Sequence, residues 1–316
     1  MISHSDLNGL MAMMPGFATD DAADFKATNT VSIERLEKGL NRMIGDGANV
    51  VAVAGSFGEF HTLLPEEFET LAKHSGEIAN NRIPLFLGTT ALNTRDAYRK
   101  LKVVSQTKAA GVLMGVPFYF PSSPQNAIRF YKDLAAEFPK LGIMIYHNPP
   151  LHNVKLTVEM IAEIAKIPNV VAMKDSHRDP VEFMRLIETV KGKMSVFVNQ
   201  TQYMAFQPLG APGFWSIDAW MGPWPQLALR DAVKRGDWAL ARQITLEIGP
   251  QSSAAPSLSW RETASKIGVK YAGYVDPGPL RPPFVEVPAE VDEGQKKKAA
   301  RWKQLCDKYR PARAAE

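Results

Sequence analysis

The chain has 316 residues and a mass of 34.9 kDa, a length that suits either two average domains or one α/β barrel of about 250 residues. Its 45% hydrophobic and 22% charged residues exclude wholesale disorder and a collagen-like fibre. The net charge of +4 does not indicate a nucleic-acid partner, because residues 294–316 hold eight Lys or Arg against two acidic residues, or +6, which leaves about −2 for the remaining chain.

Short apolar segments alternate with longer amphipathic segments about eight times along the chain. The apolar segments are almost continuously hydrophobic, as expected of parallel strands that are covered on both faces. We therefore predict eight strands, over residues 10–14, 50–54, 84–88, 111–116, 142–146, 170–174, 195–199 and 213–217.

The amphipathic segments between them predict helices over residues 31–45, 65–80, 94–110, 124–138, 157–165 and 180–191. Capping signals mark two of the helix starts: Asn93 precedes Asp96 by three residues, and Asp179 precedes Pro180. Eight strand–helix units favour a closed (β/α)8 TIM barrel over an open doubly wound sheet, the structural alternative. No GxGxxG or GxxxxGK[ST] sequence follows any strand, which removes the usual nucleotide signatures of that alternative.

The composition shifts after Pro250, where a helical segment over 258–271, a turn-rich DPGPLRPPF sequence and a charged helix over 291–309 follow. We predict a catalytic barrel domain over residues 1–250 and a C-terminal helical appendage over 251–316 that packs on it. The chain has no apolar segment of about 20 residues, and its amino-terminal segment lacks the basic and apolar parts of a signal peptide. We expect a cytoplasmic protein without a membrane partner.

Candidate reactive residues follow the strands, because barrel enzymes carry their chemistry at the carboxyl ends of strands. The second strand leads into Gly55, Ser56, Phe57, Gly58 and Glu59, where two glycines would let backbone N–H groups approach an anion. A tight strand-to-helix turn explains the same sequence equally well.

The fifth strand ends in Tyr146, followed by His147 and Asn148, and the sixth ends in Lys174. Tyr146 can relay a proton or can simply pack. A lysine that leaves an apolar strand loses hydration, which disfavours its charged form, and a neutral amine attacks ketones. The alternative is a buried ion pair of Lys174 with Asp175 or Glu59.

Other chemistries find little support in the sequence. The six histidines show no metal-ligand spacing, and HExxH and GxSxG motifs are absent. The single Cys306 excludes a thiolate cluster or a disulfide framework within one chain. We therefore expect no metal and no organic cofactor, and carbonyl chemistry at Lys174 remains.

GSFGE at 55–59, IYHNP at 145–149 and VVAMKD at 170–175 together resemble the dihydrodipicolinate synthase and N-acetylneuraminate lyase family of pyruvate-dependent class I aldolases. The resemblance covers essentially the whole barrel. Further segments resemble the aromatic hydratase-aldolases of that family, which act on trans-benzylidenepyruvates with groups such as 2-hydroxy or 2-carboxy in aromatic degradation. They are GTTALNTRD at 88–96, FWS at 214–216, GDWA at 236–239 and RPPF at 281–284.

The resemblance implies that Lys174 forms a Schiff base with a 2-keto acid, that Tyr146 shuttles protons, and that the Gly55–Gly58 backbone with Ser56 holds the carboxylate. His147 and Asn148 are candidates for steering an added water. Trp215 is a candidate wall for the aryl group. For an anionic ring substituent we choose Arg261, with Arg281, Arg178 and His147 as other available cations.

Phe57 stands where dihydrodipicolinate synthases have a second Thr, and no Arg follows the Tyr146 loop, so lysine biosynthesis is disfavoured. An aldolase or dehydratase for sugar-derived 2-keto acids and a pyruvate-binding protein without turnover remain as alternatives. The resemblance also implies a homotetramer.

Overall fold

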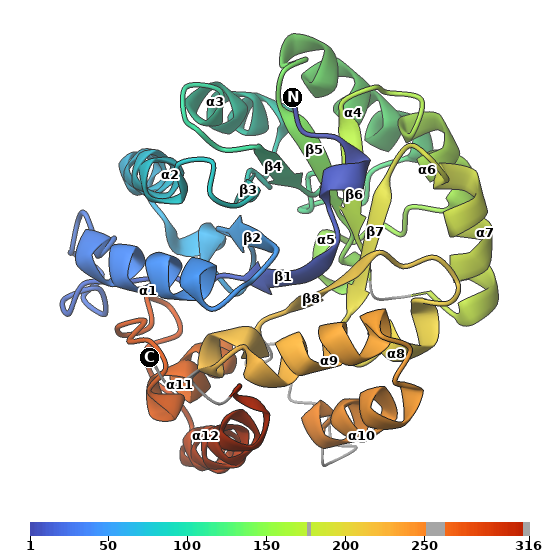
Figure 1. Ribbon diagram of the computed structural model, residues 1–316. Helices are drawn as coiled ribbons and strands as arrows, with labels where there is room; N and C mark the ends of the chain where they lie inside the picture. The colour runs from blue at the N-terminus through green and yellow to red at the C-terminus, as the bar shows by residue number, and fades with distance from the viewer. Residues whose placement is uncertain (176–177, 251–262, 312–316) are drawn as a thin grey trace.

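The computed structural model describes residues 1–175, 178–250 and 263–311. Eight parallel strands form one closed barrel in the order β1 to β8, which confirms the predicted fold class (Figure 1). Pairing of β1 with β8 closes the barrel and excludes the open sheet. The strands are β1 (Gly9–Met13), β2 (Val50–Val53), β3 (Leu85–Gly88), β4 (Gly111–Met114), β5 (Gly142–Tyr146), β6 (Val170–Lys174), β7 (Ser195–Asn199) and β8 (Gly213–Ser216).

Each observed strand overlaps its predicted counterpart, and their ends differ by at most two residues. Side chains alternate between the inside of the barrel and the layer under the helices, as the period of a strand requires. Met11 and Met13 of β1 belong to the inner cluster, whereas Leu10 and Ala12 belong to the outer one. Both faces are therefore apolar, which explains why the strands could be read from continuous hydrophobic segments.

Helices cover the outside of the barrel (Figure 1). They include α1 (Ile33–Gly45), α2 (Pro65–Ala79), α3 (Thr94–Val104), α4 (Pro124–Glu137), α6 (Val158–Ile164), α7 (Pro180–Val190), α9 (Trp224–Lys234) and α10 (Trp238–Ile248). Both predicted caps are confirmed, because the Asn93 side chain accepts from the Asp96 N–H and the Asp179 side chain accepts from the Val181 and Glu182 N–H groups. The short helices α5 (Pro149–His152) and α8 (Tyr203–Phe206) were not predicted.

The amino end of the barrel is closed by the short 3-10 helix η1 (His4–Asp6). The Ser195 hydroxyl, at the start of β7, donates to the His4 carbonyl at 2.7 Å, and Ile2 packs against the inner apolar cluster. The carboxyl ends of the strands, where Tyr146 and Lys174 lie, are at the other end of the barrel.

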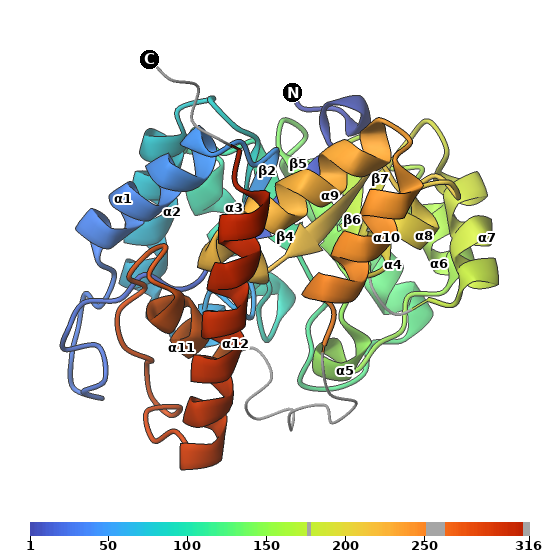
Figure 2. The same cartoon turned by 60° about the horizontal axis from the view of Figure 1, so that its bottom comes forward.

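The C-terminal part folds as α11 (Thr263–Ala272) and α12 (Ala289–Tyr309), which pack against each other and against the barrel (Figure 2). Residues 258–262 of the predicted helix 258–271 lie outside the described residues, and α11 accounts for the rest. α12 begins two residues before the predicted start and contacts α9 and the 3-10 helix η3 (Asp218–Met221). Trp302 of α12 is fully buried and donates to the Gly222 carbonyl at 3.0 Å. Among the described residues, no helix is long and apolar enough to span a bilayer.

Candidate active site

Lys174 and Tyr146 lie side by side at the mouth of the barrel, because β5 and β6 pair in the register that places them opposite each other. Lys174 is only 4% exposed. Its Nζ lies 3.7 Å from the centre of the Trp215 ring and 4.6 Å from the centre of the Tyr146 ring. The structure thus holds an amine between two aromatic rings at the end of three strands, and ring faces attract such a group when it is charged.

The Tyr146 phenol is contacted by two polar side chains. Its Oη lies 2.9 Å from Ser56 Oγ, and Asn148 Nδ2 donates to it at 3.5 Å. Ser56 comes from the loop after β2, and Asn148 follows β5. Two of the polar residues singled out in the sequence are therefore brought onto the phenol that lies beside Lys174.

The Gly55–Gly58 loop has a tightly curled backbone. Ala54 lies in the left-handed region with φ of 53°, which costs a residue with a side chain roughly 1 kcal/mol or more. A Cβ on Gly58 would lie 2.9 Å from Ala54 N and Cα, so only glycine fits there. The Phe57 ring is buried in the outer apolar cluster and anchors the middle of the loop.

His147 and Asp175 form, with Arg178, a buried group that we call the barrel cluster. Asp175 Oδ1 lies 2.7 Å from His147 Nδ1, and Asp175 Oδ2 accepts from Arg178 Nε at 2.7 Å. The Leu156 N–H donates to His147 Nε2, so the imidazole proton of a neutral His147 sits on Nδ1. No motif in the sequence connects these three residues with one another.

The barrel cluster also supports the aromatic wall. The Asp175 carbonyl accepts from the Trp215 indole N–H at 3.2 Å. Because Asp175 directly follows Lys174, the backbone that carries the amine also fixes the ring that faces it. This arrangement gives the Asp175 backbone a positioning contact with Trp215, and the ion pair of Asp175 with Lys174 that the sequence offers as an alternative stays a prediction.

His152, which no motif in the sequence singles out, packs edge-to-face on the Tyr146 ring with 4.9 Å between ring centres. It is 3% exposed, and its Nε2 has no hydrogen-bond partner within the described part of the chain. Burial, with the nearby Lys174 charge, lowers the pKa of His152 to about 3. The imidazole beside Tyr146 is therefore neutral near pH 7. No sequence signal marked it, because it ends the short Pro-Pro-Leu-His helix α5.

Three of the four cations considered for an anionic ring substituent have internal partners. Arg178 pairs with Asp175 and Glu182, and His147 pairs with Asp175. Arg281 pairs with Glu59, which is thereby the partner of Arg281 and Lys266 and does not serve Lys174 as its counter-ion. Arg261, our choice from the sequence, lies outside the described residues.

Comparison with known proteins places this arrangement in a family. The model of the dihydrodipicolinate synthetase family matches residues 13–303. The chain belongs to this family. A trans-O-hydroxybenzylidenepyruvate hydratase-aldolase of Pseudomonas putida is 31% identical over 98% of this chain and 96% of that protein. A trans-2'-carboxybenzalpyruvate hydratase-aldolase of Nocardioides sp. (strain KP7) is 27% identical over the same shares.

Solved structures agree with this membership. A structure described as PhdJ bound to a substrate intermediate superposes with a TM-score of 0.91 at 25% identity, covering 98% of this chain and 99% of that one. The dihydrodipicolinate synthase of Aquifex aeolicus shares the fold with a TM-score of 0.80 at 21% identity, over 94% and 98% of the two chains. This member of the family is a lyase of the class I aldolase type.

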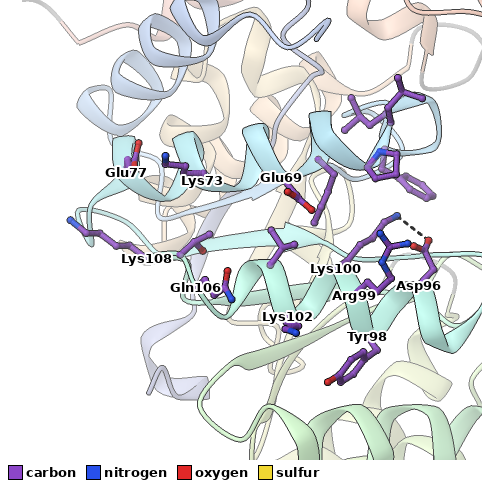
Figure 3. A pocket seen from close by; sticks show the side chains of 17 residues that line it. Glu69, Lys73, Glu77, Asp96, Tyr98, Arg99, Lys100, Lys102, Gln106 and Lys108 are labelled. Carbon is purple, nitrogen blue, oxygen red and sulfur yellow. Dashed lines mark ion pairs between the residues drawn. The ribbon is translucent and has the colours of Figure 1, made fainter. Parts of the chain in front are cut away.

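A separate groove of about 760 Å³ lies between α2 and α3 on the outside of the barrel (Figure 3). Its charged lining residues are Lys73, Arg99, Lys100, Lys102, Lys108, Glu69, Glu77 and Asp96. Lys100 lies over the Phe60 and Phe68 rings, and burial lowers its pKa. The groove includes neither Lys174 nor Tyr146, so it is separate from the candidate site at the mouth of the barrel. Within residues 1–175, 178–250 and 263–311, no three His, Cys, Asp or Glu side chains gather as metal ligands.

Proposed function

We propose that this lyase is a hydratase-aldolase that converts a trans-benzylidenepyruvate and water into pyruvate and an aromatic aldehyde. The observation that carries the proposal is the position of the Lys174 amine, buried at a strand end between the Tyr146 and Trp215 rings. The full-length similarity to hydratase-aldolases supports the reaction type. Those two relatives differ in the ring substituent named, so the proposal leaves 2-hydroxy and 2-carboxy rings to experiment.

In the first step the Lys174 nitrogen attacks C2 of the 2-keto acid, and the carbonyl oxygen leaves as water. The resulting protonated imine withdraws electrons through the conjugated double bond to C4. We assign Gly55, Gly58 and the backbone of Phe57, with the Ser56 hydroxyl, to the substrate carboxylate. This assignment is supported by Ser56 lying within hydrogen-bond distance of the phenol beside the amine.

Hydration and cleavage follow on the same imine. The oxygen of a water adds to C4 and a proton is delivered to C3. Tyr146 is suited to that proton transfer, because Ser56 and Asn148 both hold its oxygen. Loss of the C4 hydroxyl proton then breaks the C3–C4 bond, which releases the aldehyde and leaves the electron pair as an enamine. Protonation at C3 and attack of water at C2 free pyruvate and restore the amine.

Trp215 is assigned to the aryl group, because its ring lies at the mouth beside the amine and is only partly buried. His147 and Asn148 stay our candidates for steering the added water, Asn148 through its contact with Tyr146. The contact of His147 with Asp175 adds a positioning role to that candidate. Arg261 remains our choice for an anionic ring substituent. We assign catalysis to a domain of residues 1–250, with 251–316 as an appendage. We also assign a homotetramer, which light scattering tests.

The decisive experiment follows the absorbance of the enone together with pyruvate release. The wild type should bleach trans-2-hydroxy- or trans-2-carboxybenzylidenepyruvate and form one pyruvate for each molecule consumed. Lys174→Ala should do neither, whereas Lys166→Ala, which removes a mostly exposed lysine paired with Glu163, should behave as wild type. Faster turnover of sugar-derived 2-keto acids would instead favour the alternative aldolase or dehydratase. Pyruvate binding without turnover of any substrate would favour a non-catalytic protein.

A further inference from the structure

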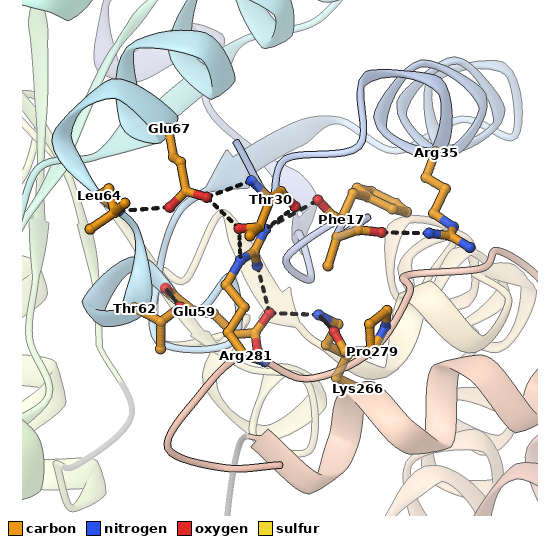
Figure 4. Close-up of polar contacts among 11 residues, drawn as sticks. Phe17, Thr30, Arg35, Glu59, Thr62, Leu64, Glu67, Lys266, Pro279 and Arg281 are labelled. Atoms are coloured by element: carbon orange, nitrogen blue, oxygen red, sulfur yellow. Dashed lines mark hydrogen bonds and ion pairs between the residues drawn. The ribbon is translucent and has the colours of Figure 1, made fainter. Parts of the chain in front are cut away.

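Glu59 directly follows the glycine loop, and its carboxylate points towards Lys266 and Arg281 (Figure 4). Its side chain is 1% exposed. Lys266 Nζ donates to Glu59 Oε2 at 2.6 Å, and Arg281 Nη1 reaches the same oxygen at 3.0 Å. The Arg281 backbone N–H donates to the other oxygen, Oε1, at 3.0 Å. We call Glu59, Lys266 and Arg281 the appendage cluster, because both cations come from the chain after residue 250.

Both cations are held by further bonds, so they form a rigid frame around Glu59. Lys266 also donates to the Pro279 carbonyl at 2.6 Å. Arg281 donates through Nε to the Thr30 hydroxyl at 2.7 Å and through Nη2 to the Thr30 carbonyl at 2.8 Å. Thr30 in turn bonds the carboxylate of Glu67 with its N–H and its hydroxyl, which fixes Thr30 from the barrel side.

The space around Glu59 leaves its carboxylate little freedom to move. A Cβ on Gly16 would lie 2.4 Å from Glu59 Oε2, so the glycine in the loop after β1 makes room for this carboxylate. The Glu59 backbone lies in the left-handed region with φ of 56°, a conformation that residues with side chains adopt only when their surroundings hold them. The two cations hold its carboxylate, and the Thr62 N–H and hydroxyl both donate to its carbonyl at 2.9 Å.

This geometry connects the appendage to the carboxylate-binding loop. Ser56 lies three residues before Glu59, and its carbonyl accepts from the Glu59 N–H at 3.1 Å. The Gly55 carbonyl accepts from the next N–H, that of Phe60. A shift of Glu59 therefore pulls on the backbone of the residues that we assign to the substrate carboxylate.

We propose that Glu59 is a positioning residue, which Lys266 and Arg281 of the appendage lock in place so that the Gly55–Gly58 loop is preformed for the carboxylate of a 2-keto acid. This inference rests on the proposed function. It assigns to the appendage a part in substrate recognition that involves no contact with the substrate. The amine of Lys174 belongs to a different strand, β6.

A stabilising ion pair alone does not explain the cluster. Burial outweighs the attraction of Glu59 and lowers the pKa of Lys266 to about 8. The fold thus disfavours the ammonium that it places there, as is common for buried ion pairs. Replacing Lys266 by the uncharged Met should leave the protein folded, which makes this variant the sharper probe.

The test traps the imine of Lys174 with borohydride and measures the labelled peptide by mass spectrometry. Pyruvate is compared with pyruvamide, which has the same ketone but no carboxylate. In Lys266→Met the pyruvate concentration for half-maximal labelling should rise roughly tenfold, or about 1.4 kcal/mol. The pyruvamide concentration for half-maximal labelling should stay within a factor of about two of the wild-type value.

Glu59→Gln should show the same selective loss wherever it folds, as judged by circular dichroism. Lys308→Met is the matched control, because it removes an appendage ion pair, with Glu247, far along the chain from the loop. Equal losses for pyruvate and pyruvamide, or no loss for either, would overturn the inference. Failure of the wild type to become labelled by pyruvate at Lys174 would overturn the proposed function itself.

Discussion

The appendage cluster and the barrel cluster are two buried groups of charges near the same candidate site, and they are built over very different chain distances. In the barrel cluster, Asp175 bonds partners 3 and 28 residues away. In the appendage cluster, Glu59 bonds partners 207 and 222 residues away. The barrel cluster therefore forms with its own strands and helix, whereas the appendage cluster forms only when the C-terminal part docks.

The two clusters also differ in charge. Glu59 faces two cations, both buried. Asp175 faces Arg178, which has Glu182 as a second anionic partner, and the imidazole of His147. Removing the central carboxylate consequently leaves two buried cations without an anion in one cluster, but leaves a paired cation in the other.

The largest expected effect compares these two carboxylates. Glu59→Gln should lower the free energy of unfolding by about 3–5 kcal/mol, because the buried Lys266 and Arg281 lose the carboxylate that pairs with both. Asp175→Asn should cost about 1–3 kcal/mol, since Arg178 keeps Glu182 and the Leu156 carbonyl. Urea unfolding at pH 7 measures both. A larger loss for Asp175→Asn would refute the charge comparison.

The sequence predicted the barrel and the mouth residues for a clear reason. Strands buried on both faces are continuous apolar segments, so Lys174 stands out at the end of Val-Val-Ala-Met-Lys. Parallel strands bring their carboxyl ends to one side, so Tyr146 and Lys174 could be expected near each other. The roles assigned to these residues remain predictions for the experiments above.

The appendage cluster could not be predicted in the same way. Lys266 lies in a helix between ordinary polar and apolar residues, and Arg281 lies in a turn-rich segment that resembles a surface loop. Their burial depends on where α11 docks, and no local pattern encodes a partner more than 200 residues away. The short helix α5 was missed because its Pro-Pro start offers no period to detect.

A fall in pH should lower the free energy of unfolding through protonation of His152 in the barrel. Its pKa is about 3 in the folded protein against 6.5 for the unfolded reference, so the folded state binds fewer protons between these values. The contribution of neutral His152 to the free energy of unfolding is therefore fully present above pH 6.5. It is lost as the pH drops towards 3, by roughly 2.5 kcal/mol from pH 6.5 to 4.5. This loss of unfolding free energy should be smaller in His152→Gln than in wild type by the same amount. In the control His74→Gln, which replaces a partly exposed histidine, the loss should equal that of wild type.

A rise in pH should raise the free energy of unfolding through deprotonation of Lys266 in the appendage cluster. Lys266 faces Glu59, Arg281 and Arg35. Its pKa is about 8 in the folded protein against 10.5 unfolded, so between these values the folded state binds fewer protons and stability rises with pH. Wild type should gain about 2 kcal/mol relative to Lys266→Met between pH 8 and 9.5. A constant difference between the two proteins would contradict this assignment.

The smallest effect separates docking of the appendage from the lock on Glu59. Lys298 of α12 pairs with Asp218 at 2.7 Å, and its side chain is 28% exposed, so Lys298→Met should cost about 1 kcal/mol. Added salt should reduce that cost, because a partly exposed pair is screened whereas a buried one is screened much less. Urea unfolding at low and high salt checks this. A loss of pyruvate labelling in Lys298→Met as large as in Lys266→Met would mean that docking of the whole appendage, and not the lock on Glu59, prepares the loop.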